Sequence, residues 1–124
     1  MKLSQEQINN LITGVALATE ITASASNLRH FVRIKGYAVN GQGKRERLSN
    51  VLNSNKVQTT FFSIQDYEVQ SLYLENNYDV TEEDCEKYSY IDNLQGITNA
   101  ELELIKHLQD FTALVPEWNC DNPL

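Results

Sequence analysis

The feature that most constrains the fold is a helix-capping pattern that recurs along the chain. A Ser or Thr is followed three positions later by Gln, Asp or Glu at Ser4/Gln7, Ser63/Asp66, Thr81/Asp84 and Thr98/Glu101. In such a capping box, the two side chains satisfy backbone N–H groups that the first helical turn leaves unpaired. The pattern therefore predicts several short helices that begin at defined residues.

Apolar residues at helical spacing extend these starts into helices of limited length. The predicted ranges are 5–23, 28–35, 44–53, 64–75, 82–93 and 98–115. The last helix has the clearest apolar stripe, which is formed by Leu104, Ile105, Leu108, Phe111, Thr112 and Val115. We therefore expect a mainly α fold, a compact bundle of about five or six short helices.

Two segments also fit an extended conformation. Residues 31–39 alternate between apolar and polar side chains, as a half-buried strand would, so the second helix has a strand as its alternative. Residues 57–62 are β-branched and aromatic, which is typical of a short strand. The length of 124 residues corresponds to one globular domain, residues 1–124.

No stretch reaches the roughly 20 apolar residues of a membrane-spanning helix. The N-terminal segment before Leu11 is not basic, so it does not resemble a secretory signal. We therefore expect a cytoplasmic protein that does not interact with membranes. The first predicted helix is apolar on two faces, which is compatible with a homo-oligomer.

Charge is distributed very unevenly along the chain. Residues 1–56 contain eight Lys or Arg and three Asp or Glu, whereas residues 57–124 contain two Lys and fourteen Asp or Glu. The resulting formal net charge of −7 makes tight, non-specific binding of nucleic acid unfavourable. Acidity of this kind attracts basic proteins, although many proteins are acidic for solubility alone.

The basic residues of the first half form a second candidate surface. They are Arg29, Arg33, Lys35, Lys44, Arg45, Arg47 and Lys56. Such a cluster could contact phosphate groups, which suggests a nucleic-acid-associated regulator using the patch 29–47. The alternative is that these cations pair with the acidic half of the same chain.

The two histidines and two cysteines offer little material for catalysis. Glu103, His107 and Asp110 share one face of the last predicted helix, but that face is the one expected to meet solvent. A small hydrolase centred on His107 or His30 is the least favoured hypothesis. Cys85 and Cys120 lack the paired spacing of a zinc site, so we expect free thiols and no metal, with a single disulfide as the alternative. We expect no enzymatic activity and no cofactor.

The most specific functional signal is an acidic, tyrosine-rich stretch over residues 66–92. It contains nine Asp or Glu, a single Lys and five of the six tyrosines. Tyrosine is enriched at binding hot spots, and carboxylates around it would speed the encounter with a cationic partner. The predicted partner-binding residues are Tyr78, Asp79, Glu82, Glu83, Asp84, Glu86, Tyr88 and Tyr90.

The resulting hypothesis is an acidic binding or inhibitor protein. Its role would be that of an immunity-type protein that neutralises a basic toxin, for example a nuclease, by covering the cationic cleft. Such clefts are positive because their substrate is a polyanion, so an acidic inhibitor would imitate the charge of the substrate.

Overall fold

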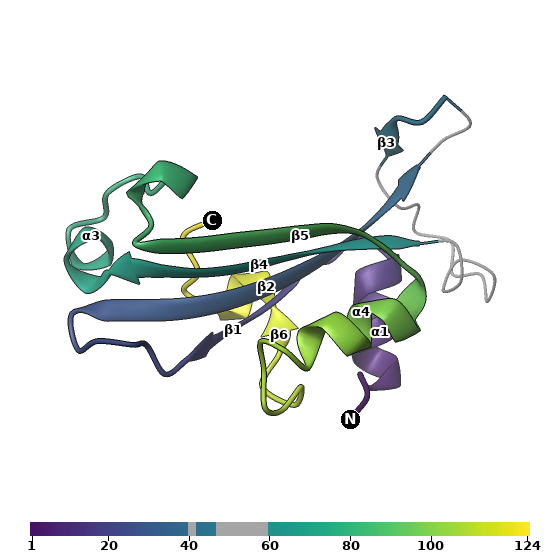
Figure 1. The fold of residues 1–124 in the computed structure, drawn as a ribbon, viewed down its shortest axis with the longest axis horizontal. Coiled ribbons are helices and arrows are strands. Elements are labelled where there is room, and N and C mark those ends of the chain that lie inside the picture. Colours follow the sequence, from purple (N-terminus) through teal and green to yellow (C-terminus); the bar gives the residue numbers. More distant parts are fainter. Residues whose placement is uncertain (40–41, 47–59) are drawn as a thin grey trace.

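The protein is built on an antiparallel β-sheet. The computed structural model describes residues 1–39, 42–46 and 60–124 (Figure 1). In the order β5-β4-β2-β1-β6, neighbouring strands are hydrogen-bonded, and β3 pairs with the end of β2. The strands are β1 (Leu17–Ile21), β2 (Leu28–Val39), β3 (Arg45–Glu46), β4 (Phe61–Gln70), β5 (Lys87–Gln95) and β6 (Val115–Pro116).

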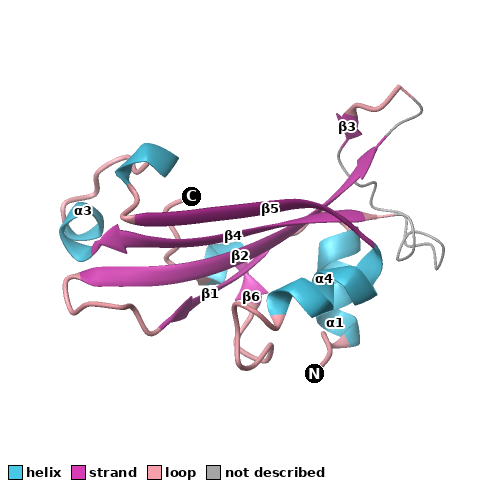
Figure 2. Cartoon of the chain, viewed as in Figure 1, coloured by secondary structure: helices cyan, strands magenta, loops and turns pink. Residues whose placement is uncertain are grey.

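The helices are short and lie at two ends of this sheet. Figure 2 shows α1 (Gln5–Ile12) and α4 (Gly96–Leu104) together near one end, and α3 (Ser71–Glu75) at the other. Two 3-10 turns, η1 (Glu82–Asp84) and η2 (Glu117–Asn119), complete the described elements. The prediction of a mainly α bundle of five or six helices is therefore wrong, because the sheet is the main element.

One face of the sheet packs against α1 and α4. Side chains alternate between the two faces of a strand, so Val32, Ile34 and Ile64 all point to this side. They are fully buried in a cluster with residues from the N-terminus, both helices and the segment after α4. The other members of this cluster are Leu3, Leu11, Leu17, Phe62, Ala100, Leu104, Leu108, Phe111 and Leu114.

The opposite face has its own smaller core. Phe31, Tyr67 and Val69 are fully buried there, and the rings of Phe31 and Tyr67 lie 5.7 Å apart. Residues of the segment that follows β4, of β5 and of the C-terminal tail pack against this core, namely Tyr73, Leu74, Val80, Cys85, Tyr88, Cys120 and Leu124. Strands β2 and β4 are therefore buried on both faces, so their sequences contain apolar residues at adjacent positions as well as alternate ones.

The first predicted helix is divided between a helix and a strand. The Ser4/Gln7 capping box forms as predicted, but α1 ends at Ile12, and Gly14 adopts a positive φ of 95°. That left-handed conformation favours glycine and turns the chain away from the helical path. The four residues 16–19 are buried consecutively, which fits a strand within a sheet that is covered on both faces.

The pairing of β2 with β4 explains why the predicted helices 28–35 and 64–75 are mainly strands. The strand alternative for residues 31–39 is confirmed, because β2 pairs with β4 from Leu28↔Gln70 to Tyr37↔Phe61. The predicted helix 64–75 is mostly β4, and only its last five residues form α3. Asp66 therefore lies in the middle of a strand and does not take part in a helix cap.

The remaining predictions have mixed outcomes. The helix 82–93 is replaced by η1 and β5, and the helix 98–115 begins at Gly96 and ends at Leu104. Phe61 and Phe62 of the expected extended segment 57–62 lie in β4, whereas residues 57–59 are outside the described residues. The predicted helix 44–53 overlaps β3 at its start, and its residues 47–53 are likewise outside the described part of the chain.

Candidate functional site

The acidic stretch forms a lobe at one end of the sheet. We define the acidic lobe as residues 71–86, which contain six carboxylates and no Lys or Arg. Within the described part of the chain, none of these carboxylates forms an ion pair. The exposed predicted residues of the lobe are Tyr78, Asp79, Glu82, Glu83, Asp84 and Glu86.

The lobe is attached firmly to the sheet beneath it. Tyr73, Leu74 and Val80 pack on the core of Phe31 and Tyr67, while the ring of Tyr78 meets Tyr73 edge-on at 5.6 Å. At the start of η1, the carboxylate of Asp84 accepts hydrogen bonds from the backbone N–H of Thr81 (2.8 Å) and from its hydroxyl (3.1 Å). The Thr81/Asp84 pair therefore forms the predicted cap, although it begins a 3-10 turn.

Two predicted contact residues lie away from the lobe surface. Tyr88 is half-buried in β5, where its ring packs against Tyr67 at 6.4 Å and its hydroxyl accepts a hydrogen bond from Gln65. Tyr90 is 44% exposed, and its hydroxyl accepts a hydrogen bond from Arg45. The structure therefore brings six of the eight predicted residues together and places Tyr88 and Tyr90 along the edge strand β5.

Three arginines of the basic cluster are paired inside the chain. Arg29 binds Glu20 with two hydrogen bonds of 2.8 and 2.7 Å, and Arg33 contacts Glu117 at 2.9 Å. Arg45 forms an ion pair with Asp92 and lies over the ring of Tyr37 at 4.4 Å. These contacts favour the interpretation that the basic residues pair internally. Lys35 is exposed, while Arg47 and Lys56 are outside the described residues.

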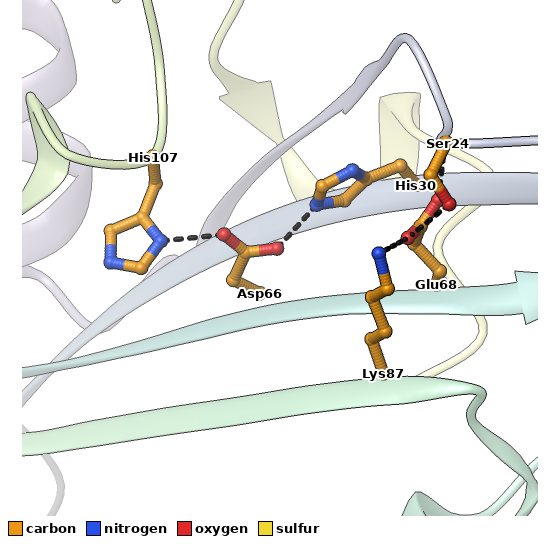
Figure 3. Close-up of polar contacts among 6 residues, drawn as sticks. All are labelled: Ser24, His30, Asp66, Glu68, Lys87 and His107. Carbon is orange, nitrogen blue, oxygen red and sulfur yellow. Dashed lines mark hydrogen bonds and ion pairs between the residues drawn. The ribbon is translucent and has the colours of Figure 1, made fainter.

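A second group of polar residues lies on the sheet face that α1 and α4 leave partly uncovered. Figure 3 shows the carboxylate of Asp66 between two imidazole rings, those of His30 and His107. One oxygen contacts Nε2 of His30, and the other lies 2.5 Å from Nδ1 of His107. The Nε2 atom of His107 in turn lies 3.4 Å from a carboxylate oxygen of Glu103. Four side chains from α4, the turn after it, β4 and β2 thus form one continuous polar chain.

The predicted group Glu103, His107 and Asp110 is only partly assembled. Because α4 ends at Leu104, the following turn directs His107 toward the sheet instead of toward solvent. The neighbouring Lys106 ammonium holds the pKa of Glu103 below its ordinary value, and His107 adds to this effect. Asp110 lies apart from this group and accepts hydrogen bonds from the backbone and hydroxyl of Thr112, which lowers its pKa.

Glu68 is a buried carboxylate next to this chain. Its side chain is almost fully buried and accepts hydrogen bonds from the backbone N–H of Ser24 (2.6 Å) and from the Ser24 hydroxyl (2.9 Å). Nζ of Lys87 lies 3.4 Å from the same carboxylate. The Ser24 backbone N–H is the main reason that the pKa of Glu68 lies below its ordinary value, with further contributions from the Ser24 hydroxyl and Lys87.

We expect Glu68→Gln to lower the free energy of unfolding at neutral pH by about 1–3 kcal/mol, because the charge that these donors stabilise is removed. Since the pKa is lowered in the folded state, this stabilisation is complete above the ordinary glutamate pKa and is lost as the pH falls through the lowered value. The difference between the two proteins should therefore shrink in acid. Denaturant unfolding over a pH series measures it, with the exposed Glu75→Gln as a control. A difference that is constant into strong acid contradicts this assignment.

His30 and Asp66 of the polar chain, together with the neighbouring Glu68, line an open pocket of about 490 Å³. Its walls include Ser24, His30, Asp66, Glu68, Lys87 and Ser89, which come from the β1–β2 connection and from strands β2, β4 and β5. Sequence reasoning missed this site because it assigned Asp66 to a helix cap. Reading residues 61–70 with a period of two would have placed Asp66 and Glu68 on the same face as Phe62 and Ile64.

The remaining candidate features carry no specific chemistry. Cys85 and Cys120 are free thiols on the smaller core, and burial raises the pKa of both.

Among the described residues, no group of three or more His, Cys, Asp or Glu is arranged to hold a metal ion. In the same residues, no helix combines the length and the apolar character needed to cross a membrane.

Comparisons with protein-family models, with curated proteins and with solved structures find no match.

Proposed function

We propose that the chain is an acidic binding protein that docks on a basic protein through its acidic lobe. The observation that carries this proposal is the set of six carboxylates that form no ion pair within the described residues. The three arginines that the structure describes, Arg29, Arg33 and Arg45, are paired with other acids. The negative potential of the lobe therefore faces solvent.

The lobe also offers apolar area for a contact. Leu72 and Tyr78 are 56% and 60% exposed, and both lie within the carboxylate-bearing segment. Buried aromatic and aliphatic anchors supply most of the binding energy in protein interfaces, while surrounding charges steer the encounter and select the partner. Tyr73, Leu74 and Val80 already fix the lobe on the sheet, so binding a partner would cost little conformational entropy.

The form of this function that we propose is inhibition of a basic enzyme, such as a toxin nuclease in the cytoplasm. A cleft that binds a polyanion is lined by Lys and Arg, and a compact group of carboxylates would cover it by the same attraction. The alternative, a nucleic-acid regulator using the basic patch, is disfavoured by the internal pairing of Arg29, Arg33 and Arg45.

The test measures binding of the chain to a small basic nuclease and to a labelled oligolysine peptide at increasing salt concentration. We expect association to slow steeply as salt rises, because salt screens charges that are separated by more than about 8–10 Å. We also expect nuclease activity to fall as the chain is added at low salt. Binding that is independent of salt, or no binding to either probe, would argue against the proposal.

A further inference from the structure

Among the described residues, His30 ends the polar chain with a ring nitrogen that has no hydrogen-bond partner. Within the residues that the structure describes, Nδ1 of His30 makes no hydrogen bond, whereas Nε2 contacts Asp66. Figure 3 shows one ring nitrogen of His30 at Asp66 and the other directed away from it. The side chain is 20% exposed and lines the pocket, so Nδ1 is accessible to a small molecule.

The carboxylate of Asp66 determines which ring nitrogen of His30 carries the proton. An ionised carboxylate only accepts hydrogen bonds, so Nε2 of His30 must carry the proton that lies between them. In the neutral ring this leaves a lone pair on Nδ1, which is the arrangement that a general base requires. The negative charge of Asp66 also stabilises the imidazolium that forms when Nδ1 takes up a proton.

His107 holds Asp66 in place and is not itself at the pocket. Its Nδ1 atom lies 2.5 Å from the second carboxylate oxygen, and its own side chain is only 11% exposed. The ring does not belong to the pocket lining. His107 is therefore a positioning residue that fixes the orientation of the carboxylate toward His30.

Lys87 supplies positive charge at the same pocket. Its side chain is 69% exposed, and its ammonium group lies 3.4 Å from Glu68, its one ion-pair partner in the described part of the chain, so Nζ can donate further hydrogen bonds to a ligand. Ser89 adds a hydroxyl to the wall. The volume of about 490 Å³ lies within the range of pockets that bind small molecules.

The geometry points to a hydrolytic site for small esters, with His30 as the general base. Nδ1 of His30 takes a proton from water while the water oxygen forms a bond to the ester carbonyl carbon. The C–O bond to the alcohol then breaks, and the imidazolium returns its proton to the leaving alkoxide, so that ester and water give acid and alcohol. Lys87 would stabilise the negative charge that develops on the carbonyl oxygen. This activity is separate from docking through the acidic lobe.

The test uses p-nitrophenyl acetate as the probe and the release of p-nitrophenolate as the readout. We expect hydrolysis by the full chain to exceed that of free imidazole at equal concentration. His30→Gln should reduce the rate by roughly 10²-fold or more, which is the usual contribution of a general base. Lys35→Gln, an exposed residue on the same strand, controls for reaction of surface amines and should leave the rate unchanged.

A second measurement examines the tautomer directly in the wild-type protein. ¹⁵N NMR of the imidazole should show neutral His30 with its proton on Nε2, and Asp66→Asn should allow the other tautomer to appear, because an amide can donate as well as accept. The inference is overturned if neutral His30 carries its proton on Nδ1, if Asp66→Asn leaves the tautomer unchanged, if the wild-type chain is no faster than imidazole, or if His30→Gln keeps the wild-type rate.

Discussion

Reversing the charge of Asp79 and Glu83 should slow association with a cationic protein by about 10-fold or more. Both side chains are exposed on the acidic lobe and make no hydrogen bond or ion pair within the described residues. Electrostatic steering raises association rates by about 10–10³-fold, and charges near the contact act mainly on this rate. The double variant Asp79→Lys/Glu83→Lys therefore weakens binding without disturbing the fold. Stopped-flow or surface-based kinetics with the basic nuclease as partner would measure the effect.

The matched control changes the same amount of charge elsewhere. Glu6 lies in the first turn of α1, and Asp110 is exposed in the segment that follows α4. The variant Glu6→Lys/Asp110→Lys has the same net charge as the lobe variant, so it tests whether the position of the charge or the total charge sets the association rate. We expect its association rate to remain within about two- to threefold of the wild type, given that a screened charge acts only over about 8–10 Å. An equal loss in both variants would show that the lobe is not the docking surface.

Leu104→Ala should lower the free energy of unfolding by about 2–5 kcal/mol, the usual loss for a fully buried leucine. Leu104 has no exposed surface and packs in the larger core between α4 and the sheet. The neighbouring Ile105 is 47% exposed, although the helical stripe predicted both residues to be core. Ile105→Ala should therefore cost about 1 kcal/mol or less.

The pair of substitutions distinguishes the observed structure from the longer predicted helix. In a helix over 98–115 with the predicted stripe, Leu104 and Ile105 would both be buried. Leu104→Ala and Ile105→Ala would then lower the free energy of unfolding by similar amounts. In the structure α4 ends at Leu104, and Ile105 begins the turn that carries His107 to the sheet. Leu102→Ala is a further control, because Leu102 is 60% exposed on α4. Urea unfolding of the three variants gives the comparison, and equal losses for Leu104 and Ile105 would contradict the fold.

Two of the four capping pairs predicted from the sequence form in the structure. The Ser4/Gln7 and Thr81/Asp84 caps form as predicted, because each joins residues only three positions apart. The acidic stretch could also be located from composition, since the six carboxylates of the lobe lie within residues 71–86 and are close together in the chain before it folds. The same reasoning failed for Ser63/Asp66, where an equally good capping pattern lies inside β4.

The larger error came from the apolar spacing of β2 and β4. Both strands are buried on both faces, so their apolar residues occupy adjacent and alternate positions, and a subset matches the i, i+3, i+4 spacing of a helix. The polar pocket was missed for the same reason. Placed on helices, Asp66 and Glu68 have no fixed relation to His30, whereas the β2–β4 register sets His30 directly opposite Glu68 and Val32 opposite Asp66.

The sequence by itself determined the Ser4/Gln7 and Thr81/Asp84 caps, the apolar positions and the charge of the acidic lobe, because these depend on residues that are near each other in the chain. Only the tertiary structure decided that the apolar segments form strands and that His30, Asp66 and His107 meet. A strand makes its hydrogen bonds to another strand that can be distant in the chain, as in the pairs Leu28↔Gln70 of β2 and β4 and Leu17↔Pro116 of β1 and β6. Its stability therefore depends on a partner that local spacing does not reveal.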